Sequence, residues 1–461
     1  MDITIVSDSL FSTSPSALAK ALHSNGHNVN MVLPFYEYEL QKQRSKLNSL
    51  GSFNMNMPFG CIRITLLHSY IEGISCFFIA NTYYFEKLQK RSAYDEAEAI
   101  SVFCHAVLEL FNYTQYFPQY IFTDSHKTAF IPALLKLKYR YIDGYESIKT
   151  FHYINENKYG IYNRAFSYSV FGIDKDAAHI LTSSNEINLT RAAIICSSRI
   201  FLGENAASIL YDKNSSIHHA ALQFGFKLRK LRMGIDYSLF DPERDPEIQK
   251  NYSSAALCDK LQNKLLIQRH YGLKQDENIP LITVYPCRVK EISQRIIKEI
   301  SRGDVQMIIL NLNSPQSRIS KPEHSCISQK TVFEETLDIL SLKNLFSASD
   351  IAVFGGFESP YGNPSFIASA YGCVPVIPTQ RYFDLGISYF NKITLEGNGY
   401  TYDMHIPKDI IYTLWDALGV YRHDKKTFNK LMQICMKKDF SVNSALKAIE
   451  QETEKSPYYQ N

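Results

Sequence analysis

The first 34 residues, MDITIVSDSLFSTSPSALAKALHSNGHNVNMVLP (1–34), decide the fold class of this chain. Residues 3–6 are mostly β-branched, which predicts a short buried strand, and residues 15–24 predict a helix with Ser14 as its N-cap. A glycine follows the helix, and residues 29–33 predict the next strand. Strand, helix and strand in this order favour a parallel pair joined by a right-handed crossover.

The same alternation of strands and helices recurs along the chain. Because the predicted strands are apolar along their length, both faces of each sheet need helices as cover, and the predicted fold class is α/β with doubly wound sheets. The predicted strands are residues 120–123, 149–153, 180–183 and 200–202 in the first half and residues 279–285, 307–312, 351–354 and 374–377 in the second, and further helices are predicted at residues 128–137, at residues 261–271 and after residue 428.

Residues 233–246 (MGIDYSLFDPERDP) interrupt this alternation with proline and charged residues. Such a composition is typical of a linker, and a chain of 461 residues exceeds what one hydrophobic core usually organises. The sequence therefore predicts two Rossmann-like domains, residues 1–235 and residues 236–461, with terminal helices that can return to the first domain.

The composition is that of a globular protein, with 45% hydrophobic and 21% charged residues. A net charge of +3, with Lys and Arg scattered along the chain, argues against a nucleic-acid partner. The nine cysteines show no metal-binding spacing, so we expect no metal site and a reducing compartment. No apolar run reaches the ~18 residues that cross a bilayer, and the chain opens directly into a strand, so we expect a cytoplasmic protein without a membrane partner. The oligomeric state stays open.

Charged side chains follow two strands predicted in the second half. In open parallel sheets, ligands bind beyond the carboxyl ends of the strands. Arg288 follows residues 279–285, where a guanidinium can pair with a diphosphate or remain a solvated surface group, and Lys290 can add a second charge. Glu358 follows residues 351–354 and a pair of glycines, where a carboxylate can accept hydrogen bonds from ribose hydroxyls or cap the next helix.

Two histidines lie at the ends of strands predicted in the first half. His126 follows residues 120–123 and Asp124, and His152 lies within residues 149–153. An imidazole there can hydrogen-bond a sugar or stabilise a developing negative charge, or it can serve packing alone. No GxSxG, P-loop, HExxH or GxGxxG motif indicates another chemistry.

With these residues in view, the chain resembles bacterial glycogen synthases and plant starch synthases, in their usual order and over nearly the full length. The most specific match is residues 233–242 (MGIDYSLFDP), which with Asp245-Pro246 and Asn251-Tyr252 is similar to the linker NGID…W-x-P-x-x-D-P…Y of that family. Residues 260–288 resemble its NK…LQ…GL…SRL segment, and residues 347–376 resemble its AGAD…P-S-x-FEPCGL…YGT-x-P-V segment.

In the first half, residues 124–126 (DSH) resemble the DWH motif of the family, and residues 151–153 (FHY) resemble its HN segment. The resemblance implies a GT-B architecture, with two Rossmann-like domains facing across a deep cleft. It also implies transfer of glucose from ADP-glucose or UDP-glucose to the end of an α-1,4-glucan, with retention. The expected partners are a nucleotide sugar and an α-glucan or maltooligosaccharide, and neither a cofactor nor a metal is expected.

The resemblance also implies roles for individual residues. As the catalytic set, Arg288 would hold the diphosphate, Glu358 the ribose and His152 the transferred glucose. The other residues that it implies are Lys290, Tyr361, Gly362, Asn363 and Thr379 on the nucleotide side and Asp124, His126 and Tyr153 on the acceptor and sugar side.

Several motifs of the family are missing from this chain. The K-x-GGL loop should lie between Asp8 and Ala17, where residues 9–15 (SLFSTSP) carry neither the lysine nor the glycine pair. The second phosphate-binding lysine falls on Ser293, and the TGGL turn falls on residues 379–382 (TQRY). Since one well-placed donor at a leaving group contributes ~3–4 kcal/mol, these losses would inactivate an enzyme unless other cations substitute.

Three interpretations are compatible with the sequence. The first is an active glycosyltransferase with a modified donor site. The second is a catalytically impaired family member that binds glucan or regulates another synthase. The third is a divergent glycosyltransferase that acts on a cell-surface polysaccharide.

Overall fold

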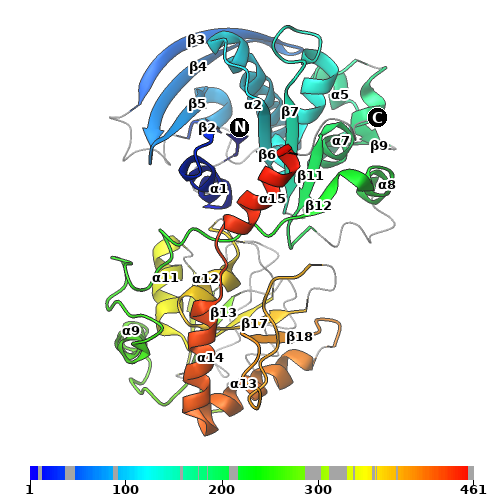
Figure 1. The fold of residues 1–461 in the computed structure, drawn as a ribbon. Helices are drawn as coiled ribbons and strands as arrows, with labels where there is room; N and C mark the ends of the chain where they lie inside the picture. Colours follow the sequence, from blue (N-terminus) through cyan, green and yellow to red (C-terminus); the bar gives the residue numbers. More distant parts are fainter. Residues whose placement is uncertain are drawn as a thin grey trace. The chain divides into compact units, whose positions relative to one another are not determined.

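The chain folds into two compact units, which we describe separately. Unit 1 comprises Met1–Met233 and Val442–Asn461, and unit 2 comprises Gly234–Ser441. The computed structural model (Figure 1) describes residues 1–8, 13–36, 47–86, 92–155, 159–174, 176–183, 185–206, 216–285, 303–310, 330–335, 338–355, 359, 361–379, 383–406 and 408–454.

Unit 1 is built on a mixed sheet in the strand order β12-β11-β7-β6-β1-β2-β5-β4-β3. From β12 to β5 all neighbours pair in parallel, and β4 and β3 extend the sheet in antiparallel fashion. The strands are β1 (Asp2–Val6), β2 (Asn28–Pro34), β3 (Asn48–Met57), β4 (Gly60–Ile71), β5 (Ile74–Ala80), β6 (Tyr120–Asp124), β7 (Lys149–Ile154), β11 (Arg199–Leu202) and β12 (Leu228–Lys230), and a separate small sheet holds β8 (Ile161–Asn163), β9 (Thr182–Ser183) and β10 (Glu186–Asn188).

Helices cover both faces of the large sheet (Figure 1). Ile3 and Ile5 of β1 pack with α1 (Thr13–Ser24) and with α15 (Asn443–Glu454), the last described helix, which belongs to unit 1. Val6 points to the opposite face, where it joins the core formed with α2, α4 and α7, as the alternation of side chains along a strand requires. The other helices of unit 1 are α2 (Ala93–Thr114), α3 (Ser125–Thr128), α4 (Phe130–Leu134), α5 (Phe166–Ser169), α6 (Ala178–Leu181), α7 (Leu189–Cys196) and α8 (Ser216–Gln223).

Unit 2 contains a sheet in which all neighbours pair in parallel, in the order β15-β14-β13-β16-β17-β18. Apolar side chains of this sheet pack with α13 and α14, while α11 contacts β13 and α12 contacts β16 and β17. The elements are β13 (Leu281–Tyr285), β14 (Gln306–Leu310), β15 (Thr331–Glu334), β16 (Ile351–Phe354), β17 (Val374–Pro378), β18 (Tyr400–Tyr402), α9 (Lys260–His270), α11 (Ile339–Ala348), α12 (Pro364–Ala370), α13 (Asp409–His423) and α14 (Lys425–Lys437).

The parallel α/β architecture predicted from the sequence is confirmed, but several local predictions were wrong. Ser14 is not an N-cap, because α1 already begins at Thr13. The helix predicted at residues 128–137 is divided into α3, α4 and a π-helical turn at Leu135–Tyr139, since Pro132 has no backbone N–H to donate to the carbonyl of Thr128.

One further prediction differs from the structure, and one group of strands was not predicted. Residues 180–181 end α6, and only residues 182–183 form a strand. The meander β3–β4–β5 was not predicted, because its outer strands are half exposed and do not read as buried apolar runs.

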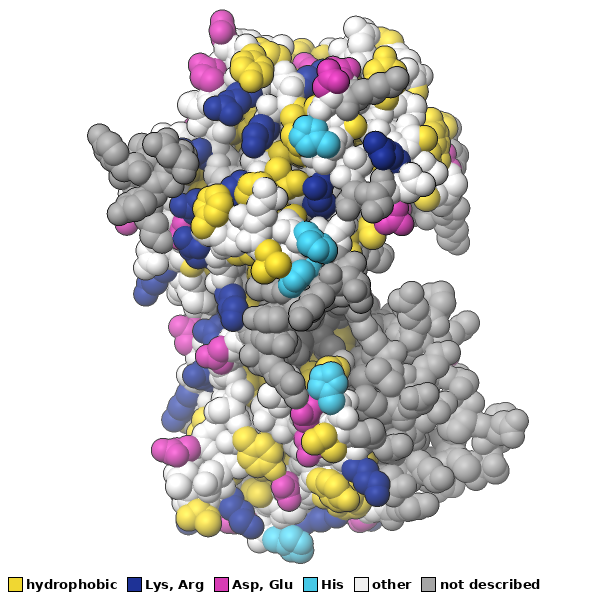
Figure 2. All heavy atoms as spheres, turned by 90° about the vertical axis from the view of Figure 1, so that its right-hand side faces the viewer, with side chains coloured by type: hydrophobic (Ala, Val, Ile, Leu, Met, Phe, Trp, Pro, Cys, Tyr) yellow, Lys and Arg dark blue, Asp and Glu magenta, His cyan; other side chains and the backbone are white. Residues whose placement is uncertain are grey.

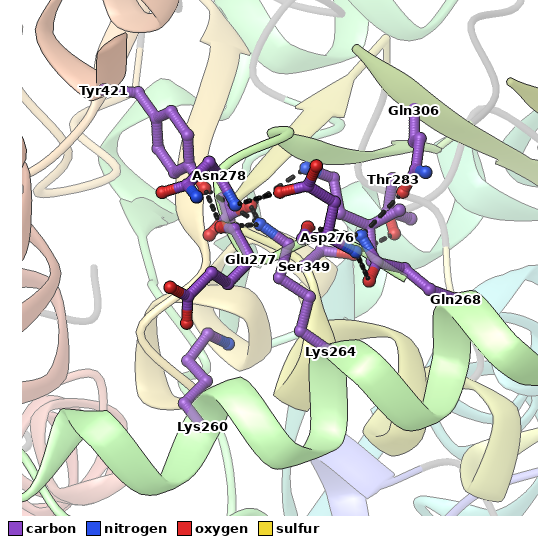
Figure 3. A network of polar contacts seen from close by, with 12 residues as sticks. Lys260, Lys264, Gln268, Asp276, Glu277, Asn278, Thr283, Gln306, Ser349 and Tyr421 are labelled. Carbon is purple, nitrogen blue, oxygen red and sulfur yellow. Dashed lines mark hydrogen bonds and ion pairs between the residues drawn. The ribbon is translucent and has the colours of Figure 1, made fainter. Parts of the chain in front are cut away.

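A buried polar network joins α9 to the sheet of unit 2. Lys260, Lys264 and Gln268 are spaced four residues apart, so they point from one face of α9 toward the interior (Figure 3). The Nζ atom of Lys264 lies 2.7 Å from Asp350 Oδ2, 2.8 Å from the Tyr421 hydroxyl and 3.0 Å from the carbonyl oxygen of Glu277. All three protons of this ammonium group therefore have acceptors, which offsets the cost of burying it.

Lys260 holds the ends of two helices. Its Nζ atom donates to the carbonyl oxygens of Phe346 (2.7 Å) and Ser347 (3.0 Å) in the last turn of α11 and of Tyr371 (2.9 Å), the C-cap of α12. A cation at the C-terminal carbonyls also complements both helix dipoles. The position of α12 thus depends on a side chain that lies more than 100 residues earlier in the chain.

Gly234 marks the point where the chain enters unit 2. Its φ angle is +76°, and a Cβ atom at this position would lie 2.4 Å from the carbonyl oxygen of Ser441. Ile235 donates its N–H to the carbonyl of Phe440 at 2.8 Å, so the entering and leaving segments pair with each other. A glycine is therefore required in the predicted linker motif.

We predict that Lys260→Met lowers the free energy of unfolding of the protein by at least ~2 kcal/mol, because three buried carbonyl oxygens lose their donor. Urea denaturation would measure the change. Gln262→Met on the exposed face of α9 is the matched control and should change stability by less than ~0.5 kcal/mol. Equal stability of the two variants would contradict the capping role.

Candidate functional site

In unit 1 the direction of strand succession reverses beside β1, which lies between β2 and β6. Loops that follow β1 and β6 diverge there at the carboxyl edge, the usual place for a ligand in such sheets. Asp124 and Tyr153 lie opposite each other at this edge, and Thr123 lies opposite His152, because β6 and β7 are neighbours. The structure thus brings the predicted residues Asp124, His126, His152 and Tyr153 together.

His152 is held as a neutral imidazole. Its Nδ1 atom lies 2.8 Å from the Thr123 hydroxyl, which also donates to the carbonyl of Phe151 at 3.2 Å. Because that hydroxyl has one proton, it either donates to the carbonyl and accepts the Nδ1–H of His152, or donates to an unprotonated Nδ1. Burial, and to a lesser extent the nearby His126, lowers the pKa of His152 to about 3.

The predicted sugar-side residues are covered in the structure. His152 is 1% exposed, Tyr153 4%, His126 6% and Asp124 7%. The Tyr153 hydroxyl has no hydrogen-bond partner among the described residues, and burial together with the charges of Glu204 and Asp124 raises its pKa well above the usual value.

Gly203, which follows β11, permits the close packing around Tyr153. A Cβ atom at Gly203 would lie 2.5 Å from the Tyr153 hydroxyl and 2.1 Å from Oδ1 of Asn155. Asn155 in turn accepts the backbone N–H of Asn205 at 3.1 Å. Neither Gly203 nor Glu204 was predicted, since nothing in a short loop after a strand distinguishes them before the strands are aligned.

Lys127 and Asp8 are charged groups at this edge that reach solvent. Lys127 Nζ lies 2.6 Å from Asp8 Oδ2, and their side chains are 39% and 23% exposed. Asp8 follows β1 and Lys127 follows β6, so this ion pair lies at the reversal point itself. Neither residue was predicted from the sequence, although Lys127 directly follows the DSH segment, a signal that could have indicated it.

Ser125 connects β6 to α3 with a left-handed backbone, with a φ angle of +67°. This conformation costs a residue with a side chain roughly 1–2 kcal/mol. Such strain is often found at functional sites, where it aims the neighbouring side chains. Here the neighbours are Asp124 and His126.

In unit 2 the reversal occurs beside β13, which lies between β14 and β16. Tyr285, the last residue of β13, is paired with Phe354, the last residue of β16. Arg288 and Lys290 follow the first strand and Glu358 follows the second, and all three side chains lie outside the described residues.

Four predicted nucleotide-side residues are described. Tyr361, Gly362 and Asn363 follow β16, and Thr379 follows the neighbouring strand β17, where its side chain is exposed and its N–H donates to the carbonyl of Tyr402 at 2.7 Å. Gly362 has a φ angle of +93°, which favours glycine. The residues therefore belong to loops at one edge of the sheet.

Asn363 has a structural task at this edge. Its Oδ1 atom accepts the backbone N–H of Ser365 at 3.0 Å and the Ser365 hydroxyl at 2.7 Å, and so it caps α12. Pro364 occupies the first turn, as expected at a helix start. The Asn363 side chain is 5% exposed, so its effect on a ligand would be indirect, through the ordering of the loop that contacts the ligand.

No group of three or more His, Cys, Asp or Glu side chains that could hold a metal ion occurs within the described ranges. Among the same residues, none of the helices is long and apolar enough to cross a membrane.

We predict that acid destabilises unit 1 through its buried histidines. Burial lowers the pKa of His105 to about 4 and that of His152 to about 3, against ~6.5 in an unfolded chain. Between pH 6.5 and about 4 the unfolded chain binds more protons, so stability falls as the pH falls, by up to ~1.4 kcal/mol per pH unit and histidine. Urea denaturation at several pH values should show a weaker pH dependence for His152→Gln and His105→Gln than for His23→Gln, an exposed control. An unchanged pH dependence in both variants would refute the assignment of neutral rings.

We predict that Ser125→Gly keeps or increases the stability of the protein, whereas Ser125→Val lowers it by ~1–2 kcal/mol. Glycine adopts the left-handed conformation without the steric cost that a β-branched side chain meets. Thermal and urea denaturation of the two variants would test this, and a valine variant as stable as the glycine variant would contradict it.

Comparisons with known proteins bear on what this arrangement does. Residues 13–205, which lie in unit 1, match the family model described as the starch synthase catalytic domain. The chain is 26% identical to a glycogen synthase of Clostridioides difficile over 458 residues, covering 94% of this chain and 93% of the relative. It is 27% identical to a glycogen synthase of Streptococcus agalactiae over 446 residues, covering 94% of each.

The fold is similar to the catalytic domain of starch synthase IV from Arabidopsis thaliana bound to ADP and acarbose, with a TM-score of 0.85, 20% sequence identity and 98% of each chain covered. That similarity shows a GT-B fold. The chain is therefore similar over most of its length to bacterial glycogen synthases, and its fold is similar to that of a plant starch synthase.

Proposed function

We propose that this glycosyltransferase moves glucose from a nucleoside diphosphate glucose, ADP-glucose or UDP-glucose, to the end of an α-1,4-glucan, with retention of configuration. The observation that carries this proposal is the pairing of Tyr285 with Phe354. Because the two strands end in register at the reversal point of unit 2, the loops that contain Arg288 and Glu358 begin side by side.

This placement suits a nucleoside diphosphate. A guanidinium at Arg288, with Lys290 nearby in sequence, would neutralise the diphosphate as charge develops on the leaving group. A carboxylate at Glu358 would accept hydrogen bonds from ribose hydroxyls. Since side chains would supply the positive charge, the proposed reaction needs neither a metal nor another cofactor. The relative bound to ADP and acarbose supports a nucleotide and an oligosaccharide as ligands.

Unit 1 would provide the sugar side at the edge that holds His152, Asp124 and His126. The ion pair of Lys127 and Asp8 would make direct contact with the ligand, because both side chains reach solvent at this edge. The buried side chains of His152, Asp124 and His126 would determine the position of the loops that follow β1 and β6 and the polarity of their surroundings. A neutral Nε2 on His152 could accept a hydrogen bond from a sugar hydroxyl once the site opens.

A second function, glucan binding without transfer, is favoured by one specific observation. The loop between Asp8 and Ala17 lacks the lysine and glycine pair of the family, and the nearby cation Lys127 is already paired with Asp8. In this alternative the protein would regulate another synthase. The two functions differ in whether the nucleotide binds.

We predict that the purified protein releases nucleotide from ADP-glucose or UDP-glucose when a maltooligosaccharide is present. Glu358→Ala should raise the donor KM by roughly 10–100-fold, because a charged hydrogen-bond acceptor contributes ~1.5–3 kcal/mol. Glu243→Ala, an exposed carboxylate of the same unit, is the matched control and should leave KM unchanged.

Calorimetry with ADP, UDP, GDP and a maltooligosaccharide separates the two functions. Nucleotide binding that Glu358→Ala weakens supports the transferase. Glucan binding without nucleotide binding or nucleotide release supports the non-catalytic alternative and contradicts the transferase.

A further inference from the structure

A cavity lies in unit 1 at the edge of the large sheet opposite to Asp124 and Tyr153. It has a volume of about 600 Å³, within the range of small-molecule sites. Residues at the start of β7 and β11, such as Lys149 and Arg199, line it, so it opens at the amino edge of the sheet. Tyr153 lies four residues further along β7, roughly 13 Å away at ~3.3 Å per residue. The cavity is therefore separate from the proposed sugar-side site.

The lining of this cavity is strongly basic. Lys136, Arg140, Lys149, Arg199 and Lys227 line it, and Glu146 is the one acidic residue among its described lining residues. Arg199 is neutralised by Glu452, whose Oε2 lies 2.5 Å from Nε. On the face shown in Figure 2, acidic and basic side chains of the described residues are interspersed.

The cations in this cavity repel one another. Lys227 donates to the carbonyl oxygen of Ile195 at 2.9 Å, and burial followed by the charge of Lys136 lowers its pKa to about 8. Arg199 contributes to the same effect. An anion bound among these groups would relieve the repulsion and gain charge-assisted hydrogen bonds.

A buried hydroxyl group also points to a ligand. Ser197, the C-cap of α7, lies in the cavity wall and is 1% exposed, and its Oγ atom has no hydrogen-bond partner among the described residues. A buried hydroxyl without a partner costs ~1–3 kcal/mol, so such groups are uncommon unless a ligand or water completes them. Ser197 can donate to a phosphate oxygen.

We propose that this cavity binds a small phosphate-bearing ligand, either free phosphate or a phosphomonoester. Lys136 and Arg140, from the π-helical turn at Leu135–Tyr139 and the residue after it, contact the phosphate together with Lys227. The exposed ring of Phe226, at 65% exposure, offers an apolar surface for the remainder of a phosphomonoester. This binding does not depend on the transferase proposal, because it uses other residues at the other edge of the sheet.

Isothermal titration calorimetry of the full chain with inorganic phosphate, fructose 6-phosphate and fructose tests the proposal. We expect both phosphate compounds to bind and fructose not to bind, with affinities that fall as salt is raised. Tighter binding of fructose 6-phosphate identifies the ligand as a phosphomonoester, and equal binding identifies free phosphate. Equal binding of fructose, or no binding of either phosphate compound, overturns the proposal.

Variants locate the binding within the protein. Lys136→Ala combined with Arg140→Ala should weaken phosphate affinity at least tenfold, whereas Lys138→Ala, an exposed neighbour outside the cavity lining, should not change it. Ser197→Ala should weaken affinity about fivefold, as expected for one hydrogen bond, while the melting temperature of the ligand-free protein stays equal or rises. Unchanged affinity in the Lys136 and Arg140 variant would place any bound phosphate elsewhere and refute the site.

Discussion

Parallel strand pairing with right-handed crossovers is the constraint on which the rest of this structure depends. Because each strand of a parallel pair starts at the same edge, all loops that follow such strands emerge together at the opposite edge. In unit 1 the parallel arrangement places Asp8, Asp124 and Lys127 at the same edge. In unit 2 it places the starts of the loops after β13 and β16 at the reversal point of the strand order. Residues from distant parts of the chain therefore become neighbours without any direct signal in the sequence.

The two sheets differ at the edge where their parallel strands begin, the amino edge. In unit 2 the edge is closed by α9, whose Lys264 satisfies Asp350 and whose Gln268 donates to Gln306 at 2.7 Å, so the polar interior is well paired. In unit 1 the corresponding edge keeps a cavity with more positive than negative charge. A satisfied network stabilises a fold, whereas unbalanced charge next to an unpaired hydroxyl is typical of a site that receives a ligand.

The buried residues Asp124, His126, His152 and Tyr153 show how burial determines the protonation state of a side chain. An imidazole such as His152, with Nδ1 fixed by Thr123, is a neutral hydrogen-bonding group and not a titrating acid. Burial, followed by the charges of Glu204 and Asp124, raises the pKa of Tyr153 and keeps its hydroxyl protonated. The similarity to glycogen synthases favours the proposed transferase, in which residues outside the missing glycine-rich loops would neutralise the donor phosphates.

By itself, the sequence determined the α/β class and most parallel strands, because apolar runs and glycine stops are local signals. The MGIDYSLFDP motif, which is also local, carries the resemblance to glycogen synthases and starch synthases. It also selected Asp124, His126, His152 and Tyr153, which the fold brings to one edge. The tertiary structure alone decided that Lys127 pairs with Asp8, that Asn363 caps α12, and that Lys260 holds α11 and α12. These roles arise from contacts between residues far apart in the chain or from the exact start of a helix, and a linear pattern carries no information about which strand ends become neighbours.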